Sequence, residues 1–88
     1  MKFYKQMNMT REDIIAKANA ALAEEFEVEE SVITPDANIK ETLELDSLGL
    51  VDLVALIDGN FGIKVTGKEL MGLKTFDSLY DFLVSKGC

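Results

Sequence analysis

Apolar residues recur along the chain at steps of three and four positions, and this spacing predicts amphipathic helices. The first buried stripe consists of Ile15, Ala18, Leu22 and Phe26. Thr10 and Asp13 stand before this stripe with the spacing of a capping box, in which each residue satisfies a free amide of the other. We therefore expect a first helix that begins at Thr10 and fades by Val28.

A second stripe predicts a helix from Ser47 to Phe61. Its core-facing residues are Leu50, Leu53, Val54, Ile57 and Phe61. The opposite side carries Leu48, Val51, Asp52, Ala55 and Gly59. Gly62 follows, and glycine readily takes the left-handed conformation that ends a helix. A leucine and a valine on the outer side indicate a small exposed apolar patch beside an acid.

Two further helices are marked by their caps. Thr66 and Glu69 form a capping box that opens a short helix ending at Gly72. Thr75 caps the last helix. The inward stripe of that helix consists of Phe76, Leu79 and Leu83. Residues 62–65, GIKV, are the one weak strand signal.

The segment 31–45 between the first two main helices is expected to be a long ordered loop. Pro35 disfavours helix at the residue before it, and Asp36 and Asn38 are typical of turns. The apolar residues expected to attach this loop to the core are Val32, Ile33, Ile39, Leu43 and Leu45. The predicted fold is all-α, a small bundle of three main helices plus one short helix.

A chain of 88 residues makes one small domain, since chains usually divide only well above ~150 residues. We expect an N-terminal extension at 1–9, a helical domain at 10–85 and a C-terminal tail at 86–88. The extension lacks the apolar run of a signal peptide, and no stretch approaches the ~20 apolar residues of a membrane span. The protein is therefore expected to be cytoplasmic. We also expect it to be a monomer.

The charge is concentrated in the middle of the chain. The net charge is −7, yet from Glu24 to Asp58 there are eleven acids and a single base, Lys40. Such a segment repels nucleic-acid phosphates and suits partners with basic surfaces. The simpler interpretation of its first part, 24–30, is a solvated face.

The sequence offers almost no catalytic machinery. It contains no histidine, which removes the commonest general base, and its one cysteine, Cys88, cannot form a cluster of metal-binding thiolates. We therefore expect neither an enzyme nor a metal site.

Ser47 is the residue with two possible roles. Serine before a helix is usually an N-cap, but Asp46 is an equally good cap, so one of the two is free for another task. The tetrapeptide Leu45–Leu48, LDSL, at the start of an acidic amphipathic helix resembles the acyl carrier proteins. The resemblance continues through 50–54, 61–63 and 75–83, and it covers roughly Thr10 to Ser85.

This resemblance implies that Ser47 carries a 4′-phosphopantetheine arm, which holds acyl groups as thioesters. A phosphopantetheinyl transferase would attach the arm, and acyl-handling enzymes of fatty-acid or polyketide-type biosynthesis would be the partners. The residues that the resemblance assigns to partner binding are Asp46, Leu48, Val51, Asp52, Ala55 and Asp58. Gly49 departs from the family pattern, which commonly has an acid there, and this puts the set of partners in doubt.

Other functions stay open from the sequence. A peptidyl or aminoacyl carrier usually has a glycine pair before the serine, unlike Glu44 and Leu45 here, whereas a D-alanyl carrier shares the Asp-Ser core. Outside the carrier class, an unmodified acidic helical adaptor could bind a basic protein surface and would need no particular serine. The apolar interior formed by Phe26, Leu43, Val54, Ile57 and Leu79 is a possible shelter for an acyl chain.

Overall fold

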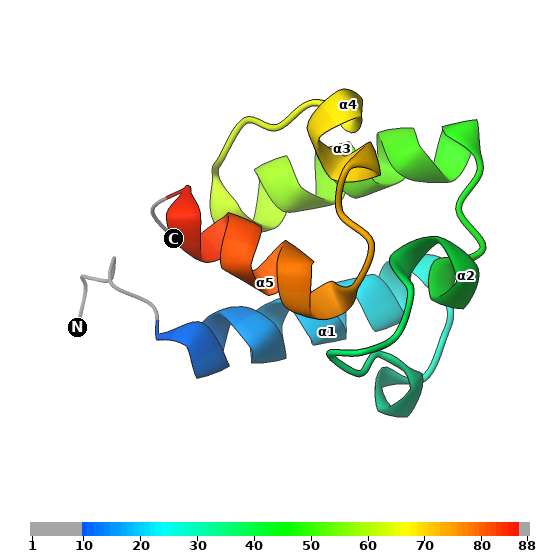
Figure 1. The fold of residues 1–88 in the computed structure, drawn as a ribbon, viewed down its shortest axis with the longest axis horizontal. Coiled ribbons are helices and arrows are strands. Elements are labelled where there is room, and N and C mark those ends of the chain that lie inside the picture. The colour runs from blue at the N-terminus through cyan, green and yellow to red at the C-terminus, as the bar shows by residue number, and fades with distance from the viewer. Residues whose placement is uncertain (1–9, 87–88) are drawn as a thin grey trace.

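The computed structural model describes residues 10–86, and in this range the chain is a bundle of helices (Figure 1). The elements in chain order are α1 (Arg11–Phe26), the 3₁₀ turn η1 (Glu30–Val32), α2 (Ile39–Leu43), α3 (Ser47–Phe61), α4 (Gly67–Met71) and α5 (Phe76–Ser85). Helix α1 packs against α3 and α5, and α4 packs on α3. Figure 1 shows α3 and α5 running opposite to α1.

The predicted all-α fold class is confirmed. The expected extension 1–9 and Cys88 lie outside the described residues.

The helix ends follow the local sequence signals. Both predicted capping boxes form, at Thr10 with Asp13 and at Thr66 with Glu69. Thr75 accepts a hydrogen bond from the Ser78 amide at the start of α5. Helix α3 spans the predicted range, and Gly62 ends it with a φ of 68°, in the left-handed region. These signals each involve residues within three positions, so they need no tertiary information.

The core lies where the three long helices meet. Fully buried side chains come from α1 (Ile14, Ala18, Leu22), α3 (Leu53, Ile57) and α5 (Phe76, Leu79, Tyr80, Leu83). The predicted stripe of α1 was wrong at one position, because Ile14 is fully buried and Ile15 only half-buried. Ile14 is four residues before Ala18, one helical turn, so it continues the line of Ala18 and Leu22.

The predicted long loop 31–45 was wrong in part, because the segment contains the end of η1 and the short helix α2. Asn38 caps α2, and its Oδ1 accepts a hydrogen bond from the Glu41 amide at 2.9 Å. Ile39 and Leu43 lie one turn apart and are both buried. Within residues 10–86 there is no strand at 62–65; the one β-bridge pairs Asn38 with Thr75.

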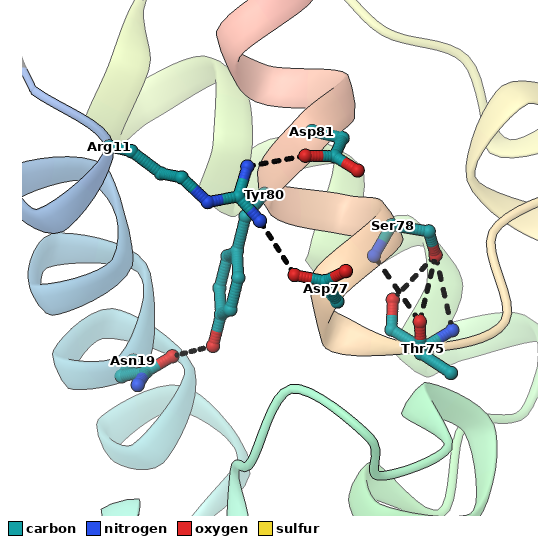
Figure 2. A network of polar contacts seen from close by, with 7 residues as sticks. All are labelled: Arg11, Asn19, Thr75, Asp77, Ser78, Tyr80 and Asp81. Carbon is teal, nitrogen blue, oxygen red and sulfur yellow. Dashed lines mark hydrogen bonds and ion pairs between the residues drawn. The ribbon is translucent and has the colours of Figure 1, made fainter.

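Polar contacts also connect α1 to α5 (Figure 2). The Arg11 guanidinium pairs with Asp77 at 2.6 Å and also with Asp81. The Tyr80 hydroxyl donates a hydrogen bond to Asn19 Oδ1 at 2.5 Å. Burial raises the pKa of the Tyr80 phenol, so this hydroxyl keeps its proton and stays a donor.

In the described part of the chain, no helix is long and apolar enough to cross a membrane. The same residues contain no group of three or more histidine, cysteine or acidic side chains placed to hold a metal ion.

Candidate functional site

Asp46 caps α3, and Ser47 is the first residue of that helix. The Asp46 carboxylate oxygen Oδ1 accepts a hydrogen bond from the Gly49 amide at 2.8 Å, and the Asp46 carbonyl accepts one from the Leu50 amide at 2.9 Å. Both bonds belong to Asp46, so the cap does not use the serine. The structure thus assigns the cap to Asp46 and leaves the Ser47 hydroxyl out of it.

The Ser47 hydroxyl is exposed, and it has no hydrogen-bond partner among residues 10–86. A helix start presents free amide groups and about half a positive charge, which favours an anion bound there. The chemistry at Ser47 is therefore that of an accessible primary alcohol beside a site that stabilises a phosphate. These properties fit a phosphopantetheine arm attached through a phosphodiester.

An apolar cleft of about 290 Å³ opens beside Ser47, between α2, the start of α3 and α4. We call it the serine cleft. Its apolar walls are formed by Ile39, Leu45, Leu50, Leu70, Met71 and Leu73. Asp46, Ser47 and Lys40 are the polar residues on its walls. Such a surface can hold an aliphatic chain close to the serine and shield that chain from water.

The interior residues suggested as an acyl shelter do not form this cleft. Phe26, Leu43, Val54, Ile57 and Leu79 all belong to the core or pack against it, and none of them lines the serine cleft. The cleft was not predicted from the sequence, because two of its walls come from α2, which was expected to be loop, and from the segment 70–73. The one feature of the sequence that could have indicated the cleft is the apolar residues at the LDSL motif, such as Leu45.

The outer face of α3 carries the predicted partner-binding residues. Leu48 and Val51 are 75% and 65% exposed, respectively, which is unusual for large apolar side chains on a core helix. Asp46, Asp52 and Ala55 are exposed as well. Four of these five residues, at positions 48, 51, 52 and 55, are spaced by three and four, so they share one side of the helix. The structure brings them together as an apolar patch with acids beside it.

Asp58 differs from the other predicted partner residues. It is half-buried, and its carboxylate forms an ion pair with Lys64 at 3.1 Å. This pair partly neutralises the C-terminal end of the outer face.

Acids from α1 extend the outer face of α3. A shallow hollow of about 490 Å³ lies between α1 and α3, and its walls include Glu24, Glu25, Asp52 and Ala55. Two acids of the run 24–30, Glu24 and Glu25, therefore lie next to the exposed patch of α3, and Lys17 lines the same hollow.

Comparison with known proteins gives a consistent result. A family model described as the phosphopantetheine attachment site matches residues 19–83. The acyl carrier protein of Rubrobacter xylanophilus is 36% identical over 76 residues, which cover 86% of this chain and 94% of that protein. The acyl carrier protein of Thermotoga maritima is 34% identical over 77 residues, covering 88% and 95% of the two chains. The meromycolate extension acyl carrier protein of Mycobacterium tuberculosis is 30% identical over 77 residues, covering 88% and 67%. The chain therefore belongs to the acyl carrier protein family, whose cofactor is covalently bound 4′-phosphopantetheine.

Proposed function

We propose that Ser47 is the attachment site of the 4′-phosphopantetheine arm and that the protein presents acyl thioesters to enzymes of fatty-acid or polyketide-type biosynthesis. The observation that carries this proposal is the division of roles at the start of α3. Asp46 makes the cap at 2.8 Å from the Gly49 amide, while the exposed Ser47 hydroxyl has no partner among the described residues.

The reaction at Ser47 is a transfer catalysed by another protein. Ser47 Oγ forms a bond to phosphorus, the pyrophosphate bond of coenzyme A breaks, and the adenosine bisphosphate leaves with the electron pair. The arm supplies a thiol that holds the acyl group as a thioester. The residues of this chain orient the attachment point: α3 fixes the serine at its first turn, and its free amides stabilise the phosphate. The apolar serine cleft, which Ser47 lines, would lie beside an arm attached there.

Partner enzymes would dock on the outer face of α3 through basic surfaces. Leu48 and Val51 provide the apolar centre of this surface, and Asp46 and Asp52 provide charge around it. Glu24 and Glu25 add to the negative potential from α1. A monomer leaves this face open to one enzyme after another. The monomeric state and the cytoplasmic location remain predictions.

The test is intact-protein mass spectrometry after incubation with coenzyme A, Mg²⁺ and a promiscuous phosphopantetheinyl transferase. We expect the wild type to gain the mass of one phosphopantetheine group. Ser47→Ala should gain nothing while staying folded by circular dichroism. Ser31→Ala removes another exposed serine, whose hydroxyl bonds only Glu29, and should be modified as fully as the wild type.

Two results would overturn the assignment. Modification of folded Ser47→Ala would move the attachment site elsewhere. Failure of the folded wild type with several transferases would leave the acidic adaptor as the better hypothesis, and binding to a basic protein surface would then survive Ser47→Ala. A D-alanyl or aminoacyl carrier would be modified in the same way, so only the cargo separates it from the proposed acyl carrier.

A further inference from the structure

The serine cleft continues into a second hollow of about 210 Å³. The two share Lys40, Met71 and Leu73 in their walls, so they adjoin, and Ser47 lines only the first of them; we call the two together the groove. The second hollow adds Asn38 and Lys74 to these residues. We call it the lysine hollow. The groove is thus apolar beside the serine and basic at its far end.

Hydrogen bonds fix the backbone of both lysines, whose side chains are exposed. The Ile39 amide donates to the Lys74 carbonyl at 2.9 Å, which holds the start of α2 against the segment before α5. The Leu45 amide donates to the Lys40 carbonyl at 3.0 Å, which folds the chain back toward Ser47 at the end of α2. Lys40 and Lys74 therefore flank the groove on two elements that are bonded to each other.

The polar groups of the lysine hollow are all suited to an anion. Lys40 and Lys74 supply two ammonium groups. The Asn38 side-chain oxygen already accepts a hydrogen bond from the Glu41 amide, which leaves its NH₂ group as a donor. No carboxylate lines this hollow. The ion pairs among residues 10–86 involve Arg11, Lys64 and Lys86, so neither hollow lysine is neutralised by an acid there.

We propose that the lysine hollow binds the carboxylate at the far end of a dicarboxylic acyl chain, so that dicarboxylic acyl groups are the preferred cargo. The inference rests on the proposed attachment of the arm to Ser47. The aliphatic part of the chain would pack on Leu45, Leu50 and Leu70 in the serine cleft. Its terminal carboxylate would then pair with Lys40 and Lys74. A simple alkyl chain leaves both ammonium groups unused, and an amino-ended chain is repelled by them.

The first test compares cargoes on the same protein. Succinyl, adipoyl and suberoyl groups are loaded onto Ser47 from their coenzyme A thioesters by the transferase, and intact mass confirms the loading. Methyl adipoyl, which is neutral, and aminohexanoyl, which is cationic, serve as controls of matched length. We expect at least one dicarboxylic group to shift the backbone amide resonances of Lys40, Leu73 and Lys74, with no such shift from either control. Equal shifts in the unacylated holo protein would assign the hollow to the phosphate of the arm and overturn the proposal.

The second test uses variants and the cleavage of the thioester by hydroxylamine. The thioester to use is the dicarboxylic one that gives the largest amide shifts in the first test. In the wild type it should be cleaved about threefold to tenfold more slowly than its methyl ester, as expected for two partly exposed ion pairs. The double variant Lys40→Met, Lys74→Met should abolish this difference, and the corresponding arginine variant should keep it. Lys68→Met removes an exposed lysine of α4 that lines neither hollow and should change nothing.

The outcomes separate this inference from the proposed function. No loading of the folded protein would contradict both. Successful loading with equal cleavage rates for all cargoes, in the wild type and in the double variant, would contradict the cargo preference and leave the carrier role intact.

Discussion

The Asp46 carboxylate accepts a hydrogen bond from the Gly49 amide at 2.8 Å, and it therefore caps α3 in place of the neighbouring serine. This contact lets Ser47, the proposed attachment residue, lie at a helix start without supplying the cap of the helix. A hydroxyl engaged in the cap would become a phosphodiester oxygen, a weaker acceptor, whenever the arm was attached. With Asp46 as the cap, the fold is expected to be the same in the unmodified and modified proteins.

The first prediction compares the two neighbouring residues. Asp46→Ala should lower the free energy of unfolding by about 1 kcal/mol, the usual cost of losing an N-cap. Ser47→Ala should stay within about 0.5 kcal/mol of the wild type, as for an exposed side chain without a partner. Urea unfolding followed by circular dichroism measures both changes. A loss in Ser47→Ala as large as in Asp46→Ala would return the serine to a structural role.

The second prediction concerns the outer face of α3. Leu48→Ser and Val51→Ser should each leave the free energy of unfolding within about 0.5 kcal/mol of the wild type, because both side chains are mostly exposed. Each should lower kcat/KM for transfer of the arm by about fivefold or more if the side chain is a central anchor of the docking surface. The measurement is the initial rate of modification by mass spectrometry.

Val84→Ser is the matched control for these two variants, since Val84 is an exposed valine on α5, outside the proposed docking surface. It should keep the wild-type rate. A decrease in Val84→Ser equal to that in Val51→Ser would indicate a general effect on the protein and not a docking site.

The sequence predicted those parts of the fold that depend on short-range signals. The capping boxes at Thr10 and Thr66 and the left-handed Gly62 each involve a few consecutive residues. Helix α2 was missed because five residues are too few to show a helical period, and the proline before it indicated a loop. Ile15 was placed in the stripe of α1 instead of Ile14, because adjacent isoleucines leave the phase of a helix ambiguous.

The candidate site was predictable in its motif but not in its surroundings. Ser47 and the exposed Leu48 and Val51 followed from the LDSL motif and the helical period. The serine cleft depends on residues such as Leu70 and Leu73 that are more than twenty positions from the serine and reach it only through tertiary packing. No local pattern places Lys74 beside Lys40.

The third prediction uses the two glycines inside α3. A Cβ at Gly59 would meet no atom within 4 Å, so Gly59→Ala should raise the free energy of unfolding by about 0.5 to 1 kcal/mol through the better helix propensity of alanine. A Cβ at Gly49 would lie 3.0 Å from Leu45 Cδ2, and this close contact opposes the same gain.

Urea unfolding of both glycine variants should therefore give a clear increase for Gly59→Ala and a smaller change or a loss for Gly49→Ala. Since Leu45 is a wall of the serine cleft, Gly49→Ala should also alter the amide resonances of residues that line it. An equal gain in both variants would show that Leu45 moves freely and that the glycine at position 49 is not required by packing.

The fourth prediction is a pH dependence at the junction of α4 and α5. Lys86 Nζ pairs with Glu69 Oε2 at 3.1 Å, and this hydrogen bond, together with the Thr66 amide, lowers the pKa of the Glu69 carboxyl. A carboxyl with a lowered pKa in the folded state stabilises the fold above its unfolded pKa, and this stabilisation is lost as the pH falls through the folded value. Lys86→Met should therefore destabilise the protein at neutral pH, and the difference from the wild type should shrink as the pH falls below 4.5. Urea titrations from about pH 7 to about pH 3 measure this difference in the free energy of unfolding.

The control uses a Glu69→Gln background. There the effect of Lys86→Met should lose its pH dependence, and only the packing of Lys86 over the Phe82 ring should remain. An effect of Lys86→Met that stays constant through this range with Glu69 present would mean that the ion pair contributes nothing measurable.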